Sequence, residues 1–120
     1  MNQPVFSPGE WNVFCTDKAA SLRFYRDLLG FVVTDIEDDA VHLRLGEQRL
    51  LLLPYAGAPA DPLPYGQQAT YSFDLMTPDL ASAYTFLAEA RVPMYRPWTP
   101  GAPSFIIRDP DNLVIEIIGR

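Results

Sequence analysis

The 120-residue sequence is poor in the side chains from which most catalytic and metal sites are built. It contains one cysteine, Cys15, and one histidine, His42. The single cysteine excludes an internal disulfide and a multi-cysteine zinc site, and the single histidine excludes any site within one chain that needs two imidazoles. No apolar run approaches the length of a membrane span, and no basic-then-apolar leader follows Met1. We therefore expect a cytoplasmic protein without a membrane partner.

Positive charge is also scarce. The formal net charge is -6, with 9 lysines and arginines against 15 acidic residues. This balance argues against nucleic acid as a partner and favours cationic or neutral ligands. Length and a hydrophobic content of 48% predict one globular domain, residues 1–120, with a core of its own.

Proline, in contrast, is abundant, and seven of the twelve prolines lie in two loops. The loop 54–68 is long for a simple connection and is expected either to cover a pocket or to cross a dimer partner. It carries Tyr55 and Tyr65, and the second loop, 97–103, carries Trp98 with Tyr95 close by. Aromatic rings on stiffened loops can stack on flat or cationic ligands, but they can equally cover a rim or a dimer contact.

The two halves of the chain repeat one plan of a strand, a helix and three strands. We expect the first unit at about 8–54, the linker loop at 54–68 and the second unit at about 69–119. The first helix should span 18–29, with Thr16 or Asp17 as its N-cap and Gly30 at its end. Each sheet should carry its own helix on one face, and the other faces should curve around a shared groove. The prediction is an α+β fold of two βαβββ repeats.

Alternation along the predicted strands defines the groove face. Its members are Glu10, Asn12, Phe14, His42, Arg44, Leu50, Leu52, Thr70, Ser72, Asp74, Val114, Glu116 and Ile118. The first strand should cover 10–15, with Trp11 in the core. A second strand should end at Thr34, before an acidic turn at 35–39, and the second unit should open with a strand at 70–75.

The stretch 104–118 predicts two strands around a turn at 109–112. Leu113, Ile115 and Ile117 should share one face, which leaves Glu116 on the other face among apolar neighbours. Because an unpaired buried carboxylate is costly, Glu116 should face water or a cavity, or have a partner. Both a solvated sheet face and a binding-site carboxylate fit this pattern.

The sequence resembles the vicinal oxygen chelate superfamily over nearly its whole length. The segments that carry the resemblance are Asp17 with Phe24-Tyr-Arg-Asp-Leu-Leu-Gly-Phe31, and Arg108-Asp-Pro-Asp-Asn-Leu-Val-Ile-Glu116. The superfamily includes glyoxalase I, extradiol dioxygenases, fosfomycin-modifying enzymes and bleomycin-binding resistance proteins. Asn112 stands where the family usually has glycine. The resemblance implies a homodimer.

In metal-dependent members four ligands come from matching places in the repeat. The resemblance places them here at Glu10, Leu52, Thr70 and Glu116. Leucine cannot bind a metal and a neutral threonine is a poor ligand. This set predicts no cofactor; a divalent metal held weakly by Glu10 and Glu116 is the alternative.

Two functions follow. The first is a protein that binds a small aromatic or cationic molecule, such as a natural-product antibiotic, without catalysis. Its expected ligand-binding residues are Glu10, Asn12, Phe14, His42, Arg44, Leu52, Tyr55, Thr70, Ser72, Trp98 and Glu116. The alternative is a divalent-metal-dependent lyase, isomerase or transferase of the glyoxalase type that uses Glu10 and Glu116. The sequence favours the binding protein and leaves enzymatic activity open.

Overall fold

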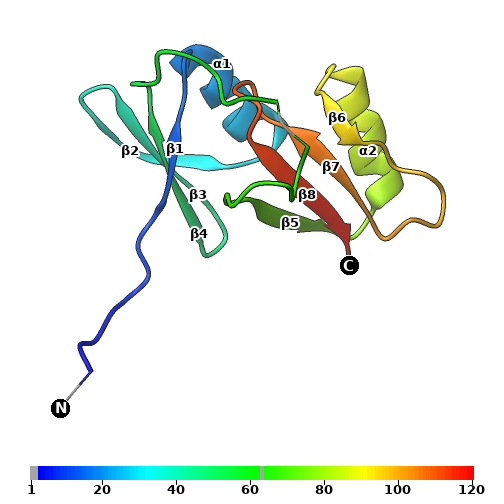
Figure 1. Cartoon of the computed structure of the whole chain (residues 1–120), viewed down its shortest axis with the longest axis horizontal. Helices are drawn as coiled ribbons and strands as arrows, with labels where there is room; N and C mark the ends of the chain where they lie inside the picture. Colours follow the sequence, from blue (N-terminus) through cyan, green and yellow to red (C-terminus); the bar gives the residue numbers. More distant parts are fainter. Residues whose placement is uncertain (1–2, 63) are drawn as a thin grey trace. The chain divides into compact units, whose positions relative to one another are not determined.

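The computed structural model describes residues 3–62 and 64–120, and the chain divides into two compact units, Met1–Ala56 and Gly57–Arg120. Each unit contains one strand, one helical segment and three further strands, which confirms the α+β fold of two repeats (Figure 1). The predicted linker loop is divided between the units at Ala56, and Leu63 within it lies outside the described residues. No helix in the described part of the chain is long and apolar enough to cross a membrane.

The two sheets have the same topology. The first unit consists of β1 (Trp11–Phe14), α1 (Lys18–Leu22), η1 (Arg23–Leu28), β2 (Val32–Glu37), β3 (Ala40–Leu45) and β4 (Gln48–Leu53). The second consists of β5 (Phe73–Thr77), α2 (Leu80–Glu89), β6 (Met94–Arg96), β7 (Ser104–Arg108) and β8 (Val114–Gly119). The strand orders are β1-β4-β3-β2 and β5-β8-β7-β6, with the first strand of each sheet parallel to its neighbour and the others antiparallel. Strand β4, which contains four consecutive leucines, is therefore central, as expected for a strand that is apolar on both faces.

The predicted helix at 18–29 forms, but as α1 followed by the π-helical segment η1. Asp17 caps it, since its carboxylate accepts a hydrogen bond from the Ala20 amide at 3.2 Å. Phe24 and Tyr25 are buried, and α1 packs on β4. Gly30 follows the helix at a φ of 88°, a left-handed conformation that glycine adopts without strain.

Two predicted strand boundaries were wrong by three residues. Strand β2 continues to Glu37, so only Asp38 and Asp39 form the turn that was expected over 35–39. Pairing with β3 provides the reason, because it extends to Glu37 opposite Ala40. In the second unit β5 begins at Phe73, where pairing with β8 starts, rather than at Thr70.

The predicted face of β4 was also wrong. Directly opposed residues of neighbouring strands share a face, and Leu52 pairs with Val41 while Leu50 pairs with Leu43. Both leucines are fully buried in the core.

The opposite face of β3 and β4 carries His42 and Arg44 from β3 with Arg49 and Leu51 from β4. His42 pairs with Leu51, and Arg44 pairs with Arg49. Trp11, expected in the core, is 42% exposed at the first position of the edge strand β1.

The second unit is organised as the sequence predicts around the β7–β8 hairpin. Phe105 and Ile115 are fully buried, and the Tyr84 ring of α2 packs edge-on against Phe105 at 5.2 Å. The turn between the strands places Asn112 at a φ of 70°, the left-handed conformation expected there. Glu116 lies on the opposite face from Ile115, as predicted, and is partly exposed.

Candidate functional site

In the first unit the single histidine lies between two carboxylates. His42 Nδ1 donates a hydrogen bond to Glu10 at 2.7 Å, and Nε2 donates to Glu37 at 3.3 Å. Carboxylate oxygens only accept, so both ring nitrogens can donate at once only when the ring is protonated. The hydrogen bond to Glu10 raises the pKa of His42 above its ordinary 6.5, and the bond to Glu37 raises it further. This cluster holds Glu10 in place with a positive charge that the chain itself supplies.

We expect the His42 cluster to make stability depend on pH. Because the folded state has the higher pKa, the charged ring contributes stability fully below the unfolded value of 6.5 and loses it as pH rises through the folded pKa. Urea denaturation of the wild type between pH 6 and 9 should therefore show a decline that His42→Gln lacks. In a proton NMR titration, Glu10→Gln should lower the pKa of His42. An unchanged pKa in that variant would contradict the assignment.

In the second unit the carboxylate of Glu116 also has hydrogen-bond partners, one of which is a cationic side chain. Its Oε2 accepts a hydrogen bond from Ser104 Oγ at 2.7 Å, and Arg96 Nη2 lies 3.5 Å from the same oxygen. Arg96 also donates to Ser104. The three side chains come from β8, β7 and β6, and the strand register places Arg96 and Glu116 opposite Ile106 on one face of the sheet. Glu116 thus has the partners that its apolar strand requires.

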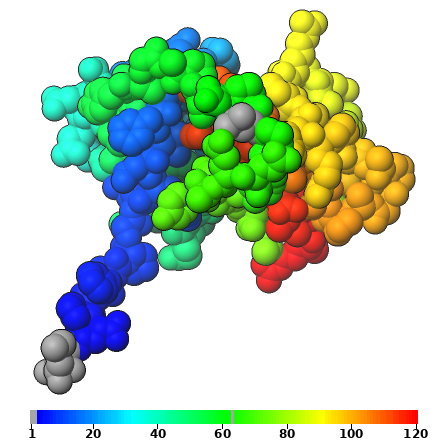
Figure 2. Space-filling view, viewed as in Figure 1, coloured from blue at the N-terminus to red at the C-terminus, as the bar shows by residue number. Residues whose placement is uncertain are grey.

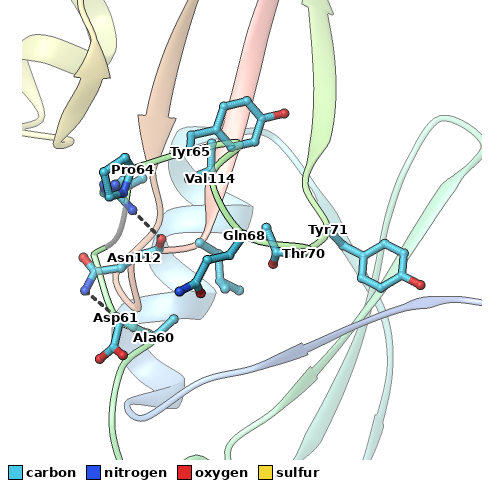
Figure 3. Close-up of a pocket in the computed structure, with 11 residues that line it drawn as sticks. Ala60, Asp61, Pro64, Tyr65, Gln68, Thr70, Tyr71, Asn112 and Val114 are labelled. Carbon is cyan, nitrogen blue, oxygen red and sulfur yellow. Dashed lines mark hydrogen bonds between the residues drawn. The ribbon is translucent and has the colours of Figure 1, made fainter.

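A pocket of about 250 Å³ lies on the second unit, next to the β7–β8 turn. Its lining residues come from the loop 57–72 and from the hairpin: Ala60, Asp61, Pro64, Tyr65, Gln68, Thr70, Tyr71, Arg108, Asn112, Leu113 and Val114. Figure 3 shows the side chains of Asp61, Gln68 and Asn112 on one side, with the Tyr71 ring extending away from them. Val114, which lines the pocket, and Glu116 are two residues apart in β8 and lie on the same face of the sheet.

The loop is held over the hairpin at several points. The Ala60 amide donates to the Asp111 carbonyl at 3.0 Å, and Asn112 Nδ2 donates to the Ala60 carbonyl at 2.9 Å. The glycine usual at this place in the family would lack that second bond. The Tyr65 amide donates to the Tyr95 hydroxyl at 3.0 Å. Figure 2 shows the loop, in green, in front of the orange and red atoms of the hairpin.

Aromatic contacts with Tyr95 also hold this loop. The guanidinium carbon of Arg108 lies 4.9 Å from the centre of the Tyr95 ring, and the Tyr65 ring meets Tyr95 edge-on at 6.3 Å. The Tyr65 hydroxyl also hydrogen-bonds to Ser72 Oγ at 2.8 Å. These contacts fix one wall of the pocket before any ligand arrives.

The other predicted binding residues lie in varied surroundings. Asn12, Phe14 and Arg44 are exposed on the first unit, as is Tyr55 after β4. Leu52 is fully buried against the core and offers no surface to a ligand. Trp98 packs against Tyr84 of α2 at 6.1 Å and donates its indole N–H to the Ala102 carbonyl.

Sequence reasoning missed much of the pocket lining. The missed residues are Ala60, Asp61, Pro64, Gln68, Tyr71, Arg108, Asn112 and Leu113. The available signal was the unusual length of the loop 54–68, which predicts a cover for a pocket but does not say which hairpin it covers.

The four positions matched to family metal ligands carry an uneven donor set. Glu10 and Glu116 each bind a cationic side chain, the Thr70 hydroxyl lies at the pocket, and Leu52 has no donor atom. Within residues 3–62 and 64–120, no group of three or more His, Cys, Asp or Glu side chains is arranged to hold a metal ion. In the His42 cluster the two carboxylates approach opposite nitrogens of one ring, which separates them rather than making them converge.

Comparison with known proteins places this fold in a family. Residues 8–117 match the model of the glyoxalase/bleomycin resistance protein/dioxygenase superfamily. No match was found among curated proteins.

Solved structures with the same fold include a lactoylglutathione lyase from Agrobacterium tumefaciens, at 23% identity, a TM-score of 0.64, and coverage of 98% of this chain and 96% of that one. A glyoxalase/dioxygenase from Nostoc punctiforme has 22% identity and a TM-score of 0.70, with 98% and 97% covered. Glyoxalase I of Leishmania major has 20% identity and a TM-score of 0.67, with 92% and 84% covered. The chain belongs to the glyoxalase/bleomycin resistance protein/dioxygenase superfamily.

Proposed function

We propose that this protein binds a small planar cation in the pocket of its second unit and does so without a metal. The observation that carries the proposal is the pocket itself, in which an unpaired carboxylate, two amides and two tyrosines surround a defined space. Apolar and aromatic walls with a few oriented polar groups are typical of small-molecule sites.

The charge of the pocket favours a cation over an anion. Asp61 is exposed and has no hydrogen bond or ion pair within the described residues, so its carboxylate is free for a ligand. Arg108 lines the same pocket, but its Nη1 donates to the Asn112 carbonyl at 2.9 Å and its guanidinium covers the Tyr95 ring. A cationic ligand would gain the Asp61 carboxylate together with contacts from the Tyr65 ring.

The volume limits the size of the ligand. Pockets for drug-sized molecules span roughly 300–1,000 Å³, and this one has about 250 Å³. A molecule with one or two rings fits that space, as does one end of a larger natural product such as an antibiotic. The loop that forms the wall is already anchored by Asn112 and Tyr65, which lowers the entropy lost when a ligand binds.

Metal independence is supported by the partners of the two candidate carboxylates. Glu116 already has Ser104 and Arg96, and Glu10 already has His42, whose pKa this contact raises. A divalent ion would have to displace these cations and would gain no donor from Leu52. The homodimer remains a prediction from the family resemblance.

A pair of probe molecules tests the proposal. Benzamidinium is a single-ring planar cation, and benzamide is its neutral counterpart of similar shape. In NMR titrations of labelled protein, benzamidinium should bind more tightly and shift the signals of Gln68 and Asn112. Asp61→Asn should weaken benzamidinium binding about fivefold, which corresponds to roughly 1 kcal/mol for an exposed charge pair. The affinity for benzamide should not change. Asp39→Asn, which removes an exposed carboxylate from the first unit, is the matched control.

Metal analysis and product analysis distinguish a metal-free binding protein from a metal-dependent enzyme of the glyoxalase type. Protein purified without chelators should contain no stoichiometric divalent metal, and Glu116→Gln should leave benzamidinium binding within twofold of the wild type. The probe should be recovered unchanged after incubation. One equivalent of zinc, nickel or iron, lost in Glu116→Gln, would favour the metal-dependent alternative over the binding protein.

A further inference from the structure

Two arginines face each other across neighbouring strands of the first unit. Arg44 in β3 pairs directly with Arg49 in β4, next to the turn that joins these strands. The Cβ atoms of such opposed residues are about 4.5–5.5 Å apart, so both side chains leave the same face of the sheet as close neighbours. Both are exposed.

Nothing in the described part of the chain neutralises this pair. Arg49 Nη2 donates to the main-chain carbonyls of Pro8 at 2.9 Å and Gly9 at 3.4 Å, which orients the guanidinium but supplies no negative charge. Within residues 3–62 and 64–120, neither arginine forms an ion pair, and the side chain of Arg44 forms no hydrogen bond. Like charges placed directly opposite in a sheet are destabilising, and here they occur in a chain whose net charge is -6.

The arginine pair lines a hollow. A pocket of about 380 Å³ is bounded by Arg44 and Arg49 together with Pro8, Gly9, Gly46 and Glu47. Glu47, although it lines the same hollow, forms no ion pair with either arginine in the described residues. Among the described residues, the Nε–H and Nη1 donors of Arg49 and all side-chain donors of Arg44 have no partner.

We propose that Arg44 and Arg49 form an oxyanion site for the carboxylate or phosphate group of a small molecule. Guanidinium groups match the paired oxygens of such anions with two parallel N–H···O bonds, and two groups from adjacent strands can bind one anion from two sides. The Pro8 and Gly9 carbonyls hold Arg49 in advance, so the anion needs to order only Arg44. This site lies wholly within the first unit and does not depend on the proposed cation pocket.

Anion titrations at constant ionic strength test the proposal. Sodium phosphate would replace sodium chloride stepwise while the side-chain Nε–H signals of Arg44 and Arg49 are followed by NMR. Both signals should shift and saturate with one common dissociation constant. Parallel titrations with methyl phosphate and with acetate determine whether the site takes a phosphate ester or a carboxylate.

Variants of matched charge identify the residues that bind. Arg44→Gln should weaken phosphate binding at least tenfold, and it should keep a folded spectrum because Arg44 is exposed and makes no internal bond. Arg49→Gln should have a similar effect. Arg23→Gln, which removes one exposed positive charge from η1, should stay within twofold of the wild type.

Two results would contradict the proposed arginine site. Shifts that rise linearly without saturation, equal in all three variants, would mean general attraction of anions rather than a site. Weakening in Arg23→Gln as large as in Arg44→Gln would overturn the assignment as well. Binding of benzamidinium is not expected to change in either case, so failure here is distinguishable from failure of the cation pocket.

Discussion

Asp109→Ala is expected to lower the free energy of unfolding by about 3 kcal/mol, because the Asp109 carboxylate satisfies two amides in a buried turn. Asp109 is 1% exposed, and its Oδ1 accepts hydrogen bonds from the amides of Asp111 at 2.8 Å and Leu113 at 2.9 Å. Each bond to a charged group is worth roughly 1.5–3 kcal/mol, and alanine leaves both amides without this acceptor. Chemical denaturation and thermal unfolding, with a fall of roughly 10 °C, measure the effect.

Two variants show whether the loss comes from the hydrogen bonds. Asp109→Asn keeps an acceptor oxygen in the same place and should recover part of the stability. Asp61→Ala, in the same unit but exposed and unpaired, should change stability by less than about 0.5 kcal/mol. If Asp109→Ala matched Asp61→Ala, the turn would not depend on this carboxylate. A destabilised turn should also weaken benzamidinium binding, since Asn112 and Leu113 line the pocket.

The β7–β8 turn is an example of a local feature that could be predicted from the sequence. Turn-forming residues between two apolar arms predicted the β7–β8 hairpin and the left-handed conformation of Asn112, and both are confirmed. The Asp17 cap and the central position of β4 were predicted on equally local grounds and are also confirmed. Each of these depends on residues close together in the sequence.

The pocket and the His42 cluster depend on distant residues and were harder to predict. The loop 57–72 has no periodicity, and its place is fixed by bonds such as Ala60 to Asp111, which only the folded chain brings together. His42 in β3 reaches Glu10, the residue just before β1, although β4 lies between β3 and β1 in the sheet. Sequence alternation placed both side chains on one face but could not identify them as partners.

The face of β4 could not be predicted because the strand itself is uninformative. Four leucines in succession, 50–53, have no alternation, so the sequence fits either of two registers that differ by one residue. The structure resolves this through cross-strand pairs: Leu52 opposes buried Val41, and Leu51 opposes His42. The correction matters for function, because it removes Leu52 from the polar face and puts Leu51 beside the histidine.

Leu52→Glu is therefore expected to prevent folding, whereas Leu51→Glu should be tolerated. Leu52 is fully buried, so the change sacrifices about 2–3 kcal/mol of apolar burial and adds several kcal/mol for an unpaired buried carboxylate. That total approaches the 5–15 kcal/mol by which whole domains are stable. Leu51 is partly exposed beside the protonated His42, which can partner a new carboxylate.

Alanine variants give the same comparison in proteins that still fold. Leu52→Ala should cost about 2–5 kcal/mol in urea denaturation, the range for a fully buried leucine, and Leu51→Ala clearly less. Circular dichroism and amide NMR spectra report whether each glutamate variant is folded. A folded Leu52→Glu beside an unfolded Leu51→Glu would shift β4 by one residue. In that register position 52 would lie on the same face as Glu10 and His42, where a glutamate could join them. This pair of variants therefore tests the strand register on which the metal-free interpretation of the first unit depends.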